Sequence, residues 1–533
     1  MMRLRPYQDE AVAAVEREWE SGRRRTLLVL PTGTGKTVVF ARIVERVADR
    51  GGRSLVLAHR GELLDQAADK IAGVTGLPCA VEKAESSSLA GLECVTVGSV
   101  QTLMRERRLS RFAADRYDCI VVDEAHHALA DSYRRILGHF AGARVLGVTA
   151  TPDRADRRGL GEVFDSLAYE YTLPQAVRDG YLCPIEAQTI PLKLDISGVE
   201  VQGGDYSAGQ LGNALDPYLD AIADEMLAAG CRERRTVVFL PLVRTARSFR
   251  DRLAERGFRA AEVDGQSGDR AEVLEAFRAG EYDVLCNSML LTEGWDCPAV
   301  DCIVVLRPTR SRPLYCQMVG RGTRLSPGTG KEKLLLLDFL WMTGRHELCR
   351  PASLVARSAE VAARMAEISE ESGGPVDLME AEEAAESDVQ RQREEAVARE
   401  LARLRGRKAR LVDPLQFEMS IQDADLSSYV PEFSWQMGPV SEGQASALEK
   451  WGIDSSAVED FGKASMILDR LAKRREAGLA TPKQIRMLER KGFRHAGTWS
   501  FDDASDMMAR LSANGWRTPR GIDPATYVPQ MAV

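Results

Sequence analysis

Short runs of apolar residues alternate with segments of helical periodicity along roughly the first two thirds of the chain. The runs at 26–30 and 119–122 are short, continuous and mostly apolar, as expected of strands buried on both faces of a parallel sheet. Residues 38–44, after the first run, have the pattern of a helix. The alternation predicts the α/β class, with two tandem parallel-sheet domains over residues 1–172 and 173–345. Strands of the second domain are expected at 236–240, 284–287, 302–306 and 333–338.

The remainder of the chain has a different composition. Residues 346–412 are rich in Ala, Glu and Arg and contain no strand-like run, which predicts a charged helical region. Residues 413–440 read as a linker, residues 441–517 as two helical repeats of about 40 residues, and residues 518–533 as a tail. A helical C-terminal region is therefore expected after the two sheets.

The two repeats align without a gap. An offset of 40 residues pairs Gln444 with Gln484 and Leu448 with Leu488. Each unit is predicted to consist of a helix stopped by a glycine, followed by a second helix. The predicted caps of the two helices are Ser441 and the vicinity of Gly462 in the first unit, and Thr481 and the vicinity of Asp502 in the second. Docking to nucleic acid, docking to a protein partner and a purely structural role all stay open for these repeats.

Composition sets limits on the kind of protein. A hydrophobic content of 44% and a charged content of 28% are ordinary for a soluble globular protein. No apolar run approaches the roughly 18 residues of a membrane span, so no membrane partner is expected. The 10 cysteines are scattered and form no CxxC pair, which argues against a disulfide framework and against zinc and favours reduced thiols in a cytoplasmic protein. Because the net charge is -8, any nucleic-acid site is expected to be a local groove.

The first candidate site lies at residues 31–37, between the first predicted strand and its helix. The sequence there is Pro-Thr-Gly-Thr-Gly-Lys-Thr, whose glycines allow backbone N–H groups and the helix N-terminus to face a phosphate. Lys36 would reach the β- and γ-phosphates, and the Thr37 hydroxyl would bind Mg²⁺. Leu30 stands where the strict pattern has glycine, but the strand–loop–helix context supports a phosphate loop. The predicted nucleotide-binding residues are Thr32, Gly33, Thr34, Gly35, Lys36 and Thr37.

An acidic pair follows the run at 119–122. Asp123 and Glu124 stand at the carboxyl end of a predicted parallel strand, which is where ligands bind in open α/β sheets. Asp123 would hold Mg²⁺, and Glu124 would act in catalysis by polarising the attacking water. Together with the phosphate loop, this pair predicts hydrolysis of a nucleoside triphosphate.

With its further motifs, the chain resembles the superfamily 2 helicases of the DEAD/DEAH type over roughly residues 3–340. The segment Leu-Arg-Pro-Tyr-Gln at 4–8 looks like the family's adenine-reading segment, which would place Gln8 on the adenine edge and Arg5 at the nucleotide. The resemblance implies two RecA-like domains that bind ATP and Mg²⁺ in the cleft between them. It also implies nucleic-acid contacts by Arg60, Ser99, Gln101, Thr102 and Thr292, and coupling of hydrolysis to movement by His126, Thr149 and Thr151.

The second domain would supply the arginines that this family uses at the γ-phosphate. Residues 317–324, Gln-Met-Val-Gly-Arg-Gly-Thr-Arg, resemble the family's arginine-finger helix. The resemblance assigns Arg321 and Arg324 to the γ-phosphate, an interaction worth about 10³–10⁵ in rate. It assigns Gln317 to orienting the water or a finger. Gly294 and Asp296 lie in a loop expected to contact ATP and the nucleic-acid strand, with Asp296 at the ribose.

Three motif details favour DNA over RNA as the substrate. Asp-Glu-Ala-His-His at 123–127, Thr-Ala-Thr at 149–151 and the finger motif resemble DNA-directed members such as RadD-type helicases, type III restriction motors and phage helicases. This resemblance implies an ATP-dependent helicase or translocase on single-stranded, forked or duplex DNA, in a bacterial or phage-infected cytoplasm. A duplex translocase or remodeller that separates no strands, an ATP-gated DNA clamp and an RNA helicase stay open as alternatives.

Overall fold

The computed structural model divides the chain into two compact units, residues 1–385 and 386–533. The second unit begins inside the long helix α15 (Leu378–Leu404). The structure describes residues 3–58, 61–84, 86–150, 160–202, 205–264, 269–288, 295–342, 348–356, 358–404, 412–421, 423, 426, 429, 431 and 435–529. Within these ranges, no helix combines the length and apolar character that crossing a membrane requires.

The N-terminal half of the first unit is built on a parallel sheet. Its strand order is β3 (Cys79–Glu82), β4 (Val95–Ser99), β2 (Ser54–Ala58), β5 (Cys119–Asp123), β6 (Arg144–Thr149), β1 (Arg25–Val29) and β7 (Ser166–Glu170). Every strand pair in it is parallel. The order places β1 and β5 on either side of β6, so the loops that follow these two strands lie at the same edge of the sheet.

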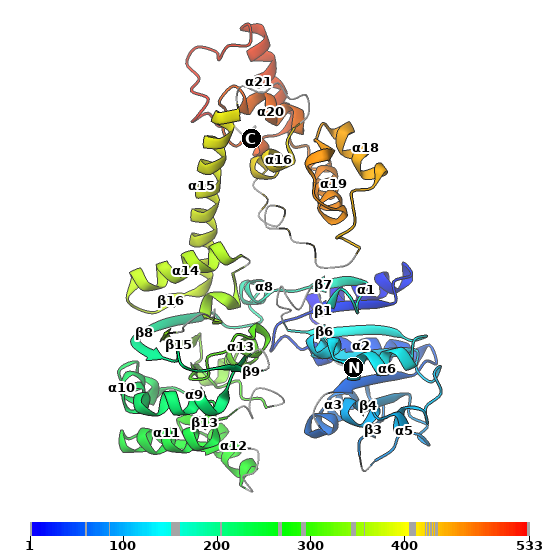
Figure 1. Ribbon diagram of the computed structural model, residues 1–533, viewed down its shortest axis with the longest axis vertical. Helices are drawn as coiled ribbons and strands as arrows, with labels where there is room; N and C mark the ends of the chain where they lie inside the picture. Colours follow the sequence, from blue (N-terminus) through cyan, green and yellow to red (C-terminus); the bar gives the residue numbers. More distant parts are fainter. Residues whose placement is uncertain are drawn as a thin grey trace. The chain divides into compact units, whose positions relative to one another are not determined.

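Helices cover both faces of this sheet, which explains why its central strands are mostly apolar (Figure 1). Leu28 of β1 packs with α1 (Pro6–Glu20), α2 (Lys36–Asp49), α3 (Gly61–Thr75) and α8 (Leu173–Arg178). Leu27 and Val29 point to the opposite face, where they pack with α4 (Val100–Leu103), α5 (Glu106–Leu109), η1 (Ala125–Leu129) and α6 (Asp131–His139). Successive strand residues alternate between two buried faces, so neither face selects polar residues.

The second half of the first unit repeats this plan with one addition. The strand order is β12 (Ala260–Val263), β13 (Val284–Asn287), β11 (Thr236–Phe239), β14 (Cys302–Val305), β15 (Leu334–Met342), β8 (Ile185–Asp195) and β16 (Val376–Asp377). All neighbours are parallel except β16, which pairs antiparallel with β8. The expectation that residues 346–412 contain no strand is therefore wrong, because a two-residue edge strand leaves no recognisable apolar run.

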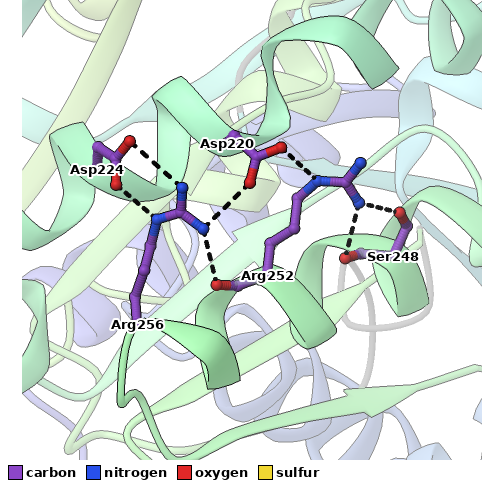
Figure 2. A network of polar contacts seen from close by, with 5 residues as sticks. All are labelled: Asp220, Asp224, Ser248, Arg252 and Arg256. Atoms are coloured by element: carbon purple, nitrogen blue, oxygen red, sulfur yellow. Dashed lines mark hydrogen bonds and ion pairs between the residues drawn. The ribbon is translucent and has the colours of Figure 1, made fainter.

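Several helices complete this second domain. The hairpin of β9 (Val201–Gln202) and β10 (Asp205–Tyr206), with α9 (Ala208–Leu215), α10 (Leu219–Ala228) and α11 (Val243–Glu255), contributes to one buried core. Figure 2 shows the ion pairs between α10 and α11: Arg252 Nε lies 3.1 Å from Asp220 Oδ2, and Arg256 bridges Asp220 and Asp224. The remaining helices are α12 (Arg270–Ala279), α13 (Arg312–Val319) and α14 (Ala359–Ser372).

The second unit confirms the predicted helical C-terminal region. Its helices are α16 (Pro414–Ser420), α18 (Glu442–Trp451), α19 (Phe461–Glu476), α20 (Pro482–Glu489) and α21 (Phe501–Ala513). Equivalent glutamines hold the two helix pairs together in the same way: Gln444 Nε2 donates to Phe461 O and Ser465 Oγ, and Gln484 Nε2 donates to Phe501 O and Ser505 Oγ. The caps of the second helices are Asp460 and Ser500, just before the predicted positions near Gly462 and Asp502, because these two side chains accept from the first-turn N–H groups.

The predicted linker and tail both contribute to the core of this unit. Phe417 and Leu426, within the expected linker 413–440, are fully buried in the same cluster as the repeats. Tyr527, within the expected tail, packs its ring against Phe493 and Trp499, at centroid distances of 5.8 and 5.5 Å. The repeats alone therefore do not make up the whole core. The flanking segments cover apolar surface that the repeats would otherwise leave exposed.

The contact between α16 and the second repeat predicts a stability effect. A Cβ on Gly497 would lie 1.8 Å from the carbonyl oxygen of Ser420. We expect Gly497→Ala to displace α16 and to lower the free energy of unfolding by about 1–3 kcal/mol. Amide hydrogen exchange over residues 414–420 measures this directly. Gly443→Ala, where a Cβ meets open space, is the matched control, and equal protection in both variants would contradict the packing.

Candidate functional site

The predicted phosphate loop, residues 31–37, contains two glycines in the left-handed conformation. Gly33 and Gly35 have φ values of +92° and +84°, and Gly35 is the N-cap of α2. A Cβ at Gly35 would lie 2.7 Å from Gln8 Nε2, so both backbone conformation and space require glycine there. Leu30 is fully buried, and its N–H donates to Thr149 O at 3.0 Å. The departure from the strict pattern is explained, because Leu30 still belongs to the sheet core.

The acidic pair faces this loop. Asp123 ends β5, and Glu124 follows it with a left-handed φ of +50°, a conformation that is uncommon for a residue other than glycine. Lys36 Nζ lies 3.1 Å from Glu124 Oε1. His126 Nδ1 lies 3.5 Å from Glu124 Oε2 and 3.5 Å from Thr149 Oγ1. Residues from the β1, β5 and β6 ends therefore meet at one edge of the sheet.

The surroundings keep the Glu124 carboxyl ionised. Burial alone would raise the pKa of Glu124, but the positive charge of Lys36, with His126 and His127, lowers it below its usual range. Glu124 is therefore a carboxylate at neutral pH. A buried carboxylate beside a lysine ammonium can both orient a water molecule and respond to charge on a bound phosphate.

The segment at 4–8 lies directly beside the phosphate loop. Gln8 Nε2 donates to Thr34 O at 3.0 Å, and Gln8 Oε1 accepts from Arg5 N at 3.0 Å. Tyr7, which the sequence analysis did not single out, donates its hydroxyl to the same Thr34 O at 2.6 Å. The Arg5 guanidinium lies 5.0 Å from the ring centroid of Tyr181. In this state both polar groups of Gln8 bind the protein, and the predicted adenine contact stays a prediction.

The two predicted finger arginines lie on the second domain, and one of them, Arg324, lies beside the predicted phosphate loop. A Cβ on Gly33 would lie 3.3 Å from Arg324 Cγ, which places this arginine beside the loop. Arg324 forms an ion pair with Asp296. Arg321 is 9% exposed, and its Nη1 donates to Trp295 O at 2.5 Å. Gln317, on α13, is also buried.

Lys331 positions the turn that carries these arginines and was missed by the sequence analysis. Its Nζ lies within hydrogen-bonding distance of four backbone carbonyls, those of Pro298, Val300, Gly322 and Arg324, at 3.1, 2.5, 2.6 and 2.7 Å. Burial lowers the pKa of Lys331. The lysine thereby ties the loop after Asp296 to the turn that contains Arg321 and Arg324.

The predicted nucleic-acid and coupling residues are only partly described. Ser99 and Thr102 are 4% and 7% exposed, whereas Gln101, between them, is exposed. Of these three side chains, Gln101 is therefore the accessible one. Arg60, Thr151, Thr292 and Gly294 lie outside the described residues.

The geometry fits a nucleotide and a magnesium ion. Gly33 and Gly35 form a cradle that a Cβ would fill, at the N-terminus of α2. Lys36 provides a cation, and Thr37 and Asp123 provide a hydroxyl and a carboxylate, oxygen ligands of the kind that Mg²⁺ prefers. The roles predicted for individual site residues remain predictions.

Comparison with known proteins identifies the family. Residues 1–154 match the family model "Type III restriction enzyme, res subunit", and residues 219–326 match "Helicase conserved C-terminal domain". A Saccharomyces cerevisiae protein assigned as the ATP-dependent helicase IRC3 is 30% identical over 67% of this chain and 54% of its own length. The DNA 3'-5' translocase XPB2 of Sulfurisphaera tokodaii is 25% identical over 62% of this chain and 80% of its own length.

A solved structure supports the same family assignment. The fragment assigned as the HsdR subunit of a type I restriction enzyme from Vibrio vulnificus YJ016 has 27% identity and a TM-score of 0.50, and the match covers 63% of each chain. The chain spans about half the length of the IRC3 relative. The sequence-based prediction of a superfamily 2 motor of the restriction type is confirmed by these matches. The chain belongs to the superfamily 2 helicases, with a motor region like that of restriction enzymes.

Proposed function

We propose that the protein is an ATP-dependent DNA helicase or translocase. The observation that carries the proposal is the meeting of Lys36 and Glu124 at 3.1 Å on one domain, with Arg324 of the other domain against Gly33 of the phosphate loop. This arrangement provides an anion-binding loop, a water-orienting carboxylate and an arginine from across the cleft. These are the parts that P-loop phosphoryl-transfer sites combine.

The residues of the loop, the acidic pair and the two arginines have different parts in the proposed hydrolysis. The N–H groups of residues 33–37 and the Lys36 ammonium bind the phosphates, while Glu124 orients and polarises the attacking water. Thr37 and Asp123 would hold Mg²⁺, which neutralises charge on the phosphates when bound. Arg321 and Arg324 would leave their resting partners, Trp295 O and Asp296, to stabilise charge that develops at the γ-phosphate. Closing and reopening the cleft would then move the protein along the strand.

DNA is the proposed substrate for two reasons. The 123–127 and 149–151 motifs resemble those of DNA-directed members. A relative that matches 62% of this chain is described as a DNA 3'-5' translocase. Both reasons concern the motor region.

Steady-state ATPase activity with different nucleic acids tests this proposal. We expect single-stranded, forked or duplex DNA to raise kcat above the rate without nucleic acid, and single-stranded RNA to raise it much less. Equal or greater stimulation by RNA would contradict DNA as the substrate and leave the motor assignment intact. Activity that no nucleic acid changes would contradict the nucleic-acid motor itself.

A duplex translocase that separates no strands is the second candidate, and the same translocase relative favours it. Displacement of a triplex-forming oligonucleotide, measured beside unwinding of a forked duplex, distinguishes the two. Triplex displacement without unwinding would support the translocase. Unwinding of the fork at a comparable rate would support the helicase.

A further inference from the structure

The second repeat carries a stripe of basic side chains on α20 and its C-cap residue, Arg490. Lys483, Arg486 and Arg490 follow one another at spacings of three and four residues, which places them on one face of the helix. Lys483 and Arg490 are exposed. Ile485 and Leu488 are buried in the core of the unit, so the stripe lies on the side of the helix away from the core. It extends roughly 10 Å along the axis at 1.5 Å per residue.

The charge of this region is opposite to that of the chain. Residues 470–495 contain nine Lys and Arg residues and two Glu residues, whereas the whole chain has a net charge of -8. Arg470 pairs with Asp423 and Lys473 pairs with Asp469, so the local positive charge comes from the later basic residues of this segment. The pKa of Arg486 is lowered by burial and by the neighbouring charge of Arg490, as expected where positive charges lie close together. A surface of this sign attracts phosphates.

Comparison of the two repeats shows that their fold does not require the stripe. The equivalent positions on α18 of the first repeat are Gly443, Ser446 and Lys450. Gln444 and Gln484 nevertheless make matching hydrogen bonds within their own units. The same helix pair thus forms with one basic residue at these positions as well as with three. Their presence in the second repeat needs an explanation other than stability.

An exposed tryptophan is fixed to the same helix end. Trp516 is 41% exposed and has a φ of +62°, a conformation that is a genuine outlier for a bulky residue. Lys491 Nζ donates to Trp516 O at 2.5 Å, and Trp516 N donates to Leu511 O at 2.7 Å. Among the described residues, only His495 and Glu124 share a positive φ without being glycine. Strained backbone of this kind is found preferentially at functional sites.

We propose that Lys483, Arg486, Arg490 and Trp516 form a platform for single-stranded DNA, separate from the motor. The basic stripe binds successive phosphates, and the indole of Trp516 stacks on an unpaired base. A single strand is specified because a base inside a duplex offers no free face to the indole. The choice of DNA rests on the proposed function, whereas the binding of a nucleic-acid strand rests on this charge and this aromatic residue.

Equilibrium binding of the full-length chain to a fluorescein-labelled oligothymidylate, without nucleotide, tests the platform. We expect the double variant Lys483→Glu and Arg490→Glu to weaken binding at least about tenfold and to reduce the slope of log K against log salt by about 1.4, which is 0.7 per lost phosphate contact. Trp516→Ala should weaken binding roughly tenfold with little change in that slope.

The two repeats provide a matched control for the charge reversal and one for the loss of the tryptophan ring. Lys450→Glu reverses the charge at the position equivalent to Arg490, and Phe501→Ala removes an exposed aromatic residue of the same unit that is 47% exposed. Both controls should bind within about twofold of the unaltered protein. Thermal unfolding shows whether each variant keeps its fold. Affinity and salt slope that stay unchanged in folded platform variants would overturn the proposal and indicate a protein-docking face instead.

The DNA-stimulated ATPase rate separates this proposal from the proposed function. At saturating DNA, the platform variants should reach the kcat of the unaltered protein, because no motor residue is altered. If DNA stimulates the unaltered protein but its binding is insensitive to the platform changes, the platform fails and the motor stands. If DNA never stimulates hydrolysis but the variants still bind less tightly, the proposed function fails and the platform stands.

Discussion

Replacing Glu124 by glutamine is expected to lower kcat for ATP hydrolysis by about 10²–10⁴ while leaving the fold and nucleotide binding in place. Glutamine keeps the size of the side chain but loses the charge that the Lys36 ammonium and the two histidines favour. The neutral amide would still lie beside Lys36 but would polarise water poorly. Lys36 would also lose its resting partner, so we expect KM for ATP to stay the same or to fall.

Two further variants give this expectation its controls. Lys36→Ala removes the cation of the phosphate loop, so ATP affinity should fall together with turnover, in contrast to Glu124→Gln. Glu162→Gln removes an exposed carboxylate that pairs with Arg134 on the surface of the same domain, and it should leave kcat unchanged. ATPase activity close to that of the unaltered protein in Glu124→Gln would exclude Glu124 as the catalytic carboxylate.

The parts of the fold that could be predicted are those that are determined by residues close together in the sequence. Strands such as 26–30 and 119–122 are continuous apolar runs because both faces of their sheet are covered. The loop 31–37 is recognisable because two glycines with positive φ and the following lysine have a fixed spacing. Burial and backbone conformation restrict the residue type at each of these positions, so the pattern is visible without knowledge of the tertiary structure.

The parts that could not be predicted depend on contacts between distant segments. Lys331 reads as one charge within Gly-Lys-Glu-Lys at 330–333, yet it is bound by four carbonyls from two loops. Phe417 reads as part of a linker because the core that buries it belongs to helices later in the chain. No periodicity or residue spacing in the sequence indicates these partners, because each segment alone is compatible with exposure to solvent.

Arg321 and Arg324 differ in the contacts that their removal would break. Arg321 is almost fully buried and donates to the carbonyl of Trp295, so its truncation would leave a backbone acceptor without its donor as well as remove a proposed finger. Arg324 instead pairs with the carboxylate of Asp296, which is 55% exposed and can be hydrated when the arginine leaves. Arg324 is therefore the clearer test of catalysis from across the cleft.

Arg324→Ala is expected to lower kcat by about 10³–10⁵, the range that an arginine finger contributes, with little change in ATP affinity measured without turnover. Arg324→Lys should restore little of the rate, because an ammonium lacks the planar, bidentate geometry of the guanidinium. Arg310→Ala, at an exposed arginine of the same domain, is the control and should retain full activity. The rates of all three variants are measured by single-turnover hydrolysis with saturating DNA, which separates chemistry from product release. If Arg324→Ala hydrolyses ATP at the rate of the unaltered protein while Arg321→Lys does not, the finger is Arg321 alone, and the Arg324–Asp296 pair holds the resting cleft without acting on the phosphate.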